Sequence, residues 1–222
     1  MRSAMTAGSS AGGPPRRGTT ARPRYEAAPG TVNLRSTLEI DDLSTRLEAR
    51  ATRFYERYGF PGWLRAHSLL VGRTAFVLAL EHQDAVDLPT VALGGYLHDI
   101  GRSPLLAGDA RDHNELSQLI LAAEGLPECA RLALCHPVYA VHDPRTAPRD
   151  LAERIVYYAD RRAGMTILGM DERITETAVR HPEYADPIER ARPLAHQVER
   201  AVYAGIASRP GDLARSVAER WP

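Results

Sequence analysis

Two side chains of types that bind metals, His98 and Asp99, stand next to each other in the segment 94–102. Imidazole nitrogen and carboxylate oxygen together suit iron, manganese and similar borderline metals, whereas closed structural zinc sites usually contain cysteine. The adjacent pair alone carries little information. It gains weight because four further residues of the same types fall on the inward stripes of predicted helices, namely His67, His113, His136 and Asp160.

Buried groups of this kind need a common partner. Burying an unpaired charge costs several kcal/mol even after relaxation, so inward-facing histidines and aspartates on separate helices predict a cation between them. A single buried histidine is more often a hydrogen-bonded core residue. Several together favour a metal site, and we expect one divalent ion to be held by His67, His98, Asp99 and Asp160.

Two more histidines determine how many ions the site holds. If His113 and His136 are also ligands, Asp99 bridges two ions roughly 3.5 to 4 Å apart and is a catalytic residue, because two such ions generate a bridging hydroxide at neutral pH. The sequence therefore predicts one or two divalent ions of iron, manganese or a similar metal. We interpret the remaining histidines as surface or structural residues: His82, His142, His181 and His196.

Helices must position these residues, since apolar residues recur at helical spacing from Asp41 onward and long alternating segments are absent. We expect an all-α fold, a compact multi-helix bundle whose first helix is capped by Asp41 or Asp42. The predicted helices end near residues 58, 82, 98, 125, 136, 160, 180 and 206, with a short helix after them. Segments 102–112 and 137–149 are predicted loops beside the site.

Composition divides the chain into two parts. Residues 1–30 are rich in Gly, Ser, Pro, Thr and Arg and lack an apolar period, so they predict a disordered N-terminal tail, and residues 31–222 form the helical domain. The 28 basic residues are all Arg and balance 28 acidic ones, which gives no reason to expect a nucleic-acid polymer or a membrane as partner. The missing lysine excludes Schiff-base chemistry and a Walker phosphate loop.

Cysteine usage and hydropathy indicate where the protein works. Cys129 and Cys135 are the only cysteines and do not form a Cys-x-x-Cys pair, so a disulfide framework is not expected. No run approaches the roughly 18 apolar residues of a membrane span, and Arg16-Arg17 lacks a following apolar stretch. These features favour a cytoplasmic protein.

Three segments resemble those of the HD-domain (HDIG-type) metal-dependent phosphohydrolases. Residues 67–73 (HSLLVGR) resemble the family's first histidine segment, residues 97–102 (LHDIGR) its His-Asp element, and residues 157–162 (YYADRR) its final aspartate segment. The resemblance covers about residues 60 to 185. It implies an all-α core and, usually, hydrolysis of a phosphate ester that is often part of a nucleotide. The metal ligands that it implies are His67, His98, Asp99 and Asp160.

The resemblance extends to particular branches and also departs from some. His113 and His136 are similar to the two extra histidines of the binuclear branch, which includes diadenosine tetraphosphate hydrolases and cyclic-dinucleotide phosphodiesterases. The chain lacks the GYP element, and Arg102-Ser103 follows Gly101 where the alarmone hydrolases carry an acidic pair. These departures argue against cyclic di-GMP and guanosine tetraphosphate as substrates.

The sequence thus predicts a hydrolase that uses metal-activated water on a small-molecule phosphomonoester or phosphoanhydride. We expect Arg102 and Arg161, which flank the ligand segments, to bind the substrate phosphate and neutralise its developing charge. Two other readings stay open: a di-iron oxygenase of the same fold acting on inositol or hydroxyphosphonates, and a metal-stabilised binding or regulatory module without turnover. The oligomeric state is not predicted.

Overall fold

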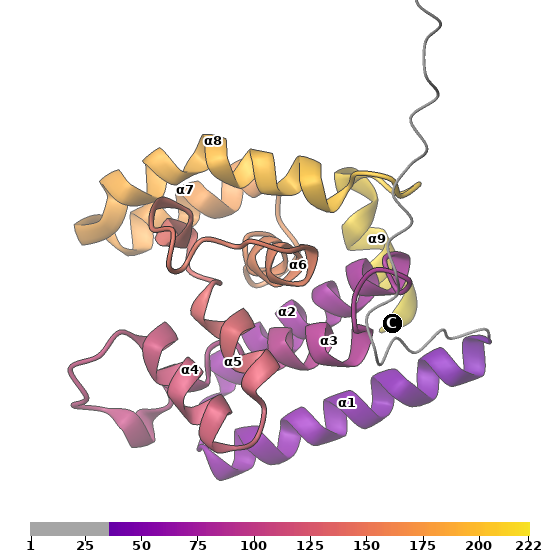
Figure 1. Ribbon diagram of the computed structural model, residues 1–222, viewed down its shortest axis with the longest axis horizontal. Helices are drawn as coiled ribbons and strands as arrows, with labels where there is room; N and C mark the ends of the chain where they lie inside the picture. The colour runs from indigo at the N-terminus through magenta and orange to yellow at the C-terminus, as the bar shows by residue number, and fades with distance from the viewer. Residues whose placement is uncertain (1–35) are drawn as a thin grey trace, which may run out of the picture.

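The computed structural model describes residues 36–222, and these residues form a bundle of α-helices joined by short turns and 3-10 segments, without a strand (Figure 1). The predicted all-α class is therefore confirmed. The predicted disordered tail, residues 1–30, lies outside the described residues. Among those that are described, none of the helices combines the length and the apolar character that crossing a lipid bilayer requires.

The helices begin and end close to where the apolar pattern and the turn residues predict. In chain order they are α1 (Thr37–Arg57), α2 (Gly62–Glu81), α3 (Leu88–Leu97), α4 (His113–Ala123), α5 (Pro127–Leu134), α6 (Leu151–Asp160), α7 (Met170–Arg180), α8 (Ala185–Val202) and α9 (Leu213–Arg220). Proline opens α5, as predicted, and the side chain of Asp150 caps α6 by accepting a hydrogen bond from Glu153 N at 2.9 Å.

The start of α1 corrects the prediction. We expected Asp41 or Asp42 as the cap, but the helix begins one turn earlier with Ser36 as N-cap. The Ser36 hydroxyl accepts a hydrogen bond from Glu39 N at 3.2 Å, and the Glu39 carboxylate accepts one from Ser36 N at 3.0 Å. This Ser-x-x-Glu capping box satisfies two backbone donors and so extends the helix beyond the first apolar residue of its stripe.

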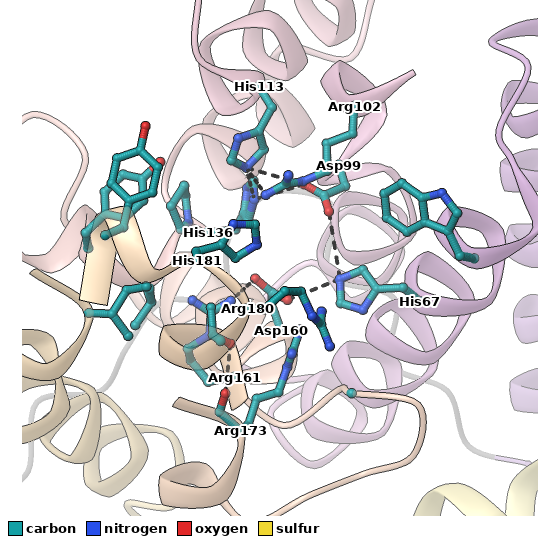
Figure 2. A pocket seen from close by; sticks show the side chains of 18 of the residues that line it. His67, Asp99, Arg102, His113, His136, Asp160, Arg161, Arg173, Arg180 and His181 are labelled. Carbon is teal, nitrogen blue, oxygen red and sulfur yellow. Dashed lines mark hydrogen bonds and ion pairs between the residues drawn. The ribbon is translucent and has the colours of Figure 1, made fainter. Parts of the chain in front are cut away.

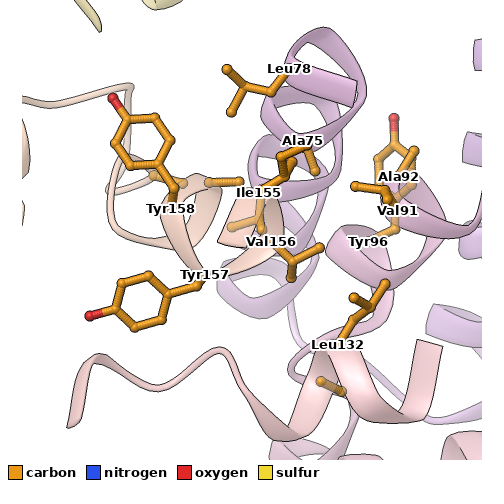
Figure 3. Close-up of a cluster of buried hydrophobic side chains, with 14 of the residues drawn as sticks. Ala75, Leu78, Val91, Ala92, Tyr96, Leu132, Ile155, Val156, Tyr157 and Tyr158 are labelled. Carbon is orange, nitrogen blue, oxygen red and sulfur yellow. The ribbon is translucent and has the colours of Figure 1, made fainter. Parts of the chain in front are cut away.

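The core lies where α2, α3 and α6 meet, and α5 closes one side of it (Figure 3). Close contact between α2 and α3 depends on glycine: a Cβ on Gly72 would overlap the ring of Tyr96, and one on Gly95 would lie 3.2 Å from the Gly72 Cα. Because glycine has no side chain, the two helices pack at short range. This packing brings the histidine of α2 next to the end of α3.

A third glycine joins the end of α3 to α4. After α3 the chain makes a 3-10 turn, η1 (Ile100–Arg102), and a Cβ on Gly101 would overlap the carbonyl oxygen of His113, the first residue of α4. Gly101 N also donates a hydrogen bond to Ser117 Oγ at 2.9 Å. The turn that carries Asp99 is therefore docked directly on the first turn of α4.

The second layer consists of α7 and α8, which run antiparallel across α6 on the side away from α1 (Figure 1). Both helices are amphipathic. Their buried residues include Ile174 and Ala178 on α7 and Ile188, Ala191 and Ala195 on α8. This pair forms one wall of the cavity that is described next.

Candidate metal centre

The predicted ligand residues converge on one cavity of about 540 Å³ (Figure 2). They come from five places in the fold, and all except His67 stand at or beside a helix end. The set comprises His67 in α2, His98 and Asp99 directly after α3, His113 at the start of α4, His136 just after α5, and Asp160 at the end of α6. All line the cavity except His98, which is fully buried behind the others.

Four of these residues surround one small space. His67 Nε2 lies 3.8 Å from Asp99 Oδ2 and 3.2 Å from Asp160 Oδ1. His98 Nε2 lies 3.6 Å from Asp99 Oδ2 and 4.0 Å from Asp160 Oδ1. Metal bonds of about 2.1 Å place neighbouring ligand atoms about 3.0 to 3.4 Å apart. We call these four residues the first ligand set; their spacing suits one divalent ion after a small contraction.

The remaining ligands form a second set that shares Asp99. Asp99 Oδ1 lies 3.5 Å from His113 Nε2 and 3.2 Å from His136 Nε2, and the two histidine nitrogens lie 3.1 Å apart. Asp99 therefore turns one carboxylate oxygen toward each ligand set. A carboxylate between two ions has this arrangement in two-metal sites.

Hydrogen bonds to main-chain carbonyls fix the histidine rings. His98 Nδ1 bonds to Gly95 O at 2.7 Å, and His136 Nδ1 bonds to Ala133 O at 2.5 Å. A carbonyl only accepts, so both protons are on Nδ1 and both Nε2 lone pairs face the cluster. His98 Nε2 is buried and has no hydrogen-bond partner among the described residues. A metal ion would satisfy this orphaned acceptor, so the residues fit the implied cofactor.

Burial and neighbouring charges keep the ligands in the protonation states that metals bind. Burial lowers the pKa of His98 to about 4 and holds the pKa of His113 well below 6.5. Burial alone would raise the pKa of Asp99, but neighbouring groups, with the charge of Arg102 first among them, outweigh it and lower that pKa well below 3.8. Arg161 has the same effect on the pKa of Asp160 against its burial. At neutral pH His98 and His113 are therefore neutral, and Asp99 and Asp160 are ionised.

These shifts predict a pH dependence of stability in chelator-treated protein. Because the pKa of His98 is lower in the folded chain than its ordinary 6.5, the unfolded chain binds more protons between pH 6.5 and 4, and stability falls as the pH falls through this range. The loss reaches on the order of 3 kcal/mol near pH 4. Urea unfolding at several pH values measures it, and His98→Gln should flatten the slope; an unchanged slope contradicts the assignment.

The two arginines that the sequence assigns to substrate both line the cavity. Arg102 Nε donates to Asp99 Oδ1 at 2.8 Å, and its Nη2 lies 3.0 Å from His113 Nε2. Arg161 is buried and its Nη2 donates to Asp160 Oδ2. Each guanidinium thus stands beside one of the two aspartates. The geometry places both cations at the site but does not test their predicted role.

Sequence reasoning missed a further group of cavity residues. Arg173 and Arg180 reach the cavity from α7, and an aromatic rim is formed by Trp63, Tyr139 and Tyr184. The signal for the arginines was present, because a separation of seven residues places both on one face of a helix. What the pattern did not indicate is that this face of α7 turns toward the ligand residues.

Three of the four histidines set aside by the sequence lie away from the cavity. His82 bonds to Val202 O at 2.7 Å, His142 bonds to Pro187 O at 3.0 Å, and His196 pairs with carboxylates on α7 and α8. The fourth, His181, which we predicted to be a surface or structural residue, lines the cavity at the end of α7. The reason is again the packing of α7 over the site.

Comparison with known proteins agrees with this geometry. The family model for the HD domain matches residues 64–165. No curated protein and no solved structure matches the chain. The matched segment contains every residue of the two ligand sets, which form groups able to hold a metal ion, and it ends before α7 begins. The chain therefore carries an HD domain over residues 64–165, which is consistent with the HD-domain superfamily of metal-dependent phosphohydrolases.

Proposed function

We propose that the protein hydrolyses a phosphomonoester or phosphoanhydride of a small molecule, with a nucleotide as the substrate that the cavity favours. The observation that carries the proposal is the buried Nε2 of His98, which has no hydrogen-bond partner in the described part of the chain and faces two ionised aspartates at the wall of an arginine-rich cavity. One divalent ion on the first ligand set, with a second on Asp99, His113 and His136, would supply an activated water and polarise the phosphoryl oxygens.

Charge in the cavity supports a phosphate substrate. Of the described residues that line it, four are arginines and two are aspartates: Arg102, Arg161, Arg173, Arg180, Asp99 and Asp160. Both aspartates are proposed ligands, so their charge serves the metal. The arginines then present a cationic surface to an incoming anion, and a guanidinium matches phosphate oxygens with a fixed fork of donors.

The cationic groups nearest the ligands are suited to neutralise charge in the transition state. Arg161 keeps two buried nitrogens, Nε and Nη1, without a hydrogen-bond partner in the part of the chain described. Arg102 is 36% exposed and extends into the cavity from the turn beside Asp99. Donors already fixed in place stabilise the negative charge that spreads over the equatorial oxygens during phosphoryl transfer.

The aromatic rim favours a nucleotide over a small sugar phosphate. The rings of Tyr139 and Tyr184 stack with centroids 6.0 Å apart and planes inclined by 27°. Trp63, 60% exposed, stands at another edge of the same cavity. Aromatic side chains stack on all of the nucleobases, and each stacked base contributes about 1–3 kcal/mol to the binding free energy.

The test begins with metal analysis of purified protein, followed by a panel of phosphate esters and nucleotides with manganese, iron, cobalt and magnesium under strict anaerobiosis. We expect phosphate release from at least one phosphorylated compound. Oxygen uptake with a mixed-valence di-iron absorption band, and no phosphate release, would instead identify an oxygenase. Bound metal without turnover of any compound would identify a binding module.

Arg102 gives a sharper test of substrate charge. Replacing Arg102 with Gln should lower turnover of the phosphorylated substrate by about one to two orders of magnitude, because one transition-state donor is lost, while the metal content stays the same. Arg192→Gln is the matched control, since Arg192 pairs with Asp171 and Glu189 outside the cavity. Loss of metal together with turnover would make Arg102 a structural residue.

A further inference from the structure

A buried arginine in the cavity wall, Arg173, is only partly satisfied by hydrogen-bond acceptors among the described residues. Arg173 on α7 is only 5% exposed, yet its Nε has no hydrogen-bond partner among the described residues. Arg173 Nη1 donates a hydrogen bond to Glu176 Oε2 at 2.8 Å. Arg162 is buried to the same degree, but its Nε, Nη1 and Nη2 all donate to oxygen atoms of the protein. Hydrogen bonds within the protein therefore account for the burial of the Arg162 guanidinium, whereas they do not fully account for the burial of the Arg173 guanidinium.

A second buried arginine shares this property and lies on the same side of the cavity. Arg161 is 4% exposed, and within residues 36–222 its Nε and Nη1 have no hydrogen-bond partner. Figure 2 shows Arg161, Arg173 and Arg180 gathered around Asp160, on the opposite side of the ligand cluster from Arg102. Burial, together with the charge of Arg161, lowers the pKa of Arg173 even though Asp160 opposes this.

The anions nearby do not balance these cations. Glu176 serves two arginines at once: it accepts from Arg173 Nη1 at 2.8 Å and from Arg180 Nη2 at 2.6 Å. Asp160 is the other carboxylate, and it is a proposed metal ligand. Three guanidiniums therefore share two carboxylates, one of which is needed elsewhere. Unsatisfied buried donors with excess positive charge at a cavity wall are what a bound anion would satisfy.

We propose that Arg173 and Arg180 form a second anion-binding subsite next to Arg161, and that this subsite holds a phosphate group of the substrate other than the one that is cleaved. The inference rests on the proposed function and narrows it to substrates with at least two phosphate groups, such as a nucleoside diphosphate or triphosphate. Both α7 arginines lie outside residues 64–165. The subsite thus adds specificity from beyond the matched domain.

Binding of non-hydrolysable probes to the full-length, metal-loaded protein tests the subsite without turnover. Calorimetry compares methylphosphonate, which has one anionic group, with methylenebisphosphonate, which has two. Arg173→Gln should weaken bisphosphonate binding by about ten- to a hundredfold, the loss of one charged hydrogen-bonding partner, and leave methylphosphonate binding unchanged. Arg192→Gln should change neither, because Arg192 lies outside the cavity.

Kinetics provide a second measurement with the same variants. For Arg173→Gln, kcat/KM should fall for a nucleoside triphosphate, mainly through KM, and not for the monophosphate of the same base. Because Arg173 is buried, Arg180→Gln gives an independent variant at a side chain that is 53% exposed. It should show the same selectivity, and Arg173→Lys should retain part of the bisphosphonate affinity.

The outcomes separate the two proposals. Unchanged bisphosphonate binding in both Arg173→Gln and Arg180→Gln overturns the subsite, as does an equal loss for both probes. If Arg173→Gln does not fold, Arg180→Gln alone decides in the same way. Selective loss of bisphosphonate binding in a protein that hydrolyses no phosphate compound would support the subsite and overturn the proposed function.

Discussion

Replacing Asp99 with alanine should remove metal from both ligand sets and abolish metal-dependent hydrolysis, while the helical fold survives. Asp99 directs Oδ2 toward His67 and His98 and Oδ1 toward His113 and His136, so a single deletion opens both groups. Removing partners that only orient a ligand already costs about 10- to 100-fold in affinity or activity, and losing the ligand itself should exceed that. Metal analysis, circular dichroism and turnover measure the three effects.

The comparison with His98→Ala sharpens this expectation. His98 Nε2 faces Asp99 Oδ2 and Asp160 Oδ1 of the first set, so its loss should also abolish activity and remove the ion of that set. His142→Ala is the control, because His142 bonds to Pro187 O and does not line the cavity. Wild-type metal content and turnover in both Asp99→Ala and His98→Ala would refute the assignment of the cluster.

The number of ions is the second large effect. Protein that carries its native metal should hold about two ions per chain, and His113→Ala should hold about one, because His113 belongs only to the second ligand set. Elemental analysis against protein concentration measures this. His136→Ala should give the same result.

The structure offers an explanation if the wild type, His113→Ala and His136→Ala each hold only one metal ion per chain. Arg102 Nη2 lies 3.0 Å from His113 Nε2, and Arg102 Nε lies 2.8 Å from Asp99 Oδ1. The guanidinium would then supply the positive charge at the second set, and His113 and His136 would be structural residues. The ion count therefore decides between a metal ion and an arginine as the second cation.

The sequence predicted which residues meet at the cavity because each of them carries a local signal. His67 falls on the apolar stripe of its helix, and Asp160 ends a helix whose inward residues keep their register. Helix periodicity showed that these polar residues lie on buried faces. Because burying an unpaired polar group is costly, we could predict that they meet around a common partner. The helix limits followed from proline, glycine and capping residues, apart from the early start at Ser36.

The missed residues carry no comparable signal. Arg173, Arg180 and His181 lie on an ordinary amphipathic helix in a chain whose basic residues are all arginine. Their place at the cavity depends on how the α7–α8 pair folds back over α6, which is a long-range contact. Periodicity shows which face of a helix is buried, but it does not show which neighbour buries it.

The fit between Gly101 and α4 has a consequence for how such sites diversify. Because no side chain can be accommodated there without displacing the His113 carbonyl, the spacing between Asp99 and the second ligand set is set by one main-chain contact. A larger residue would displace His113 from Asp99, whereas His67, His98 and Asp160 are held by other elements. We therefore expect a substitution at Gly101 to weaken the proposed second ion site more than the first.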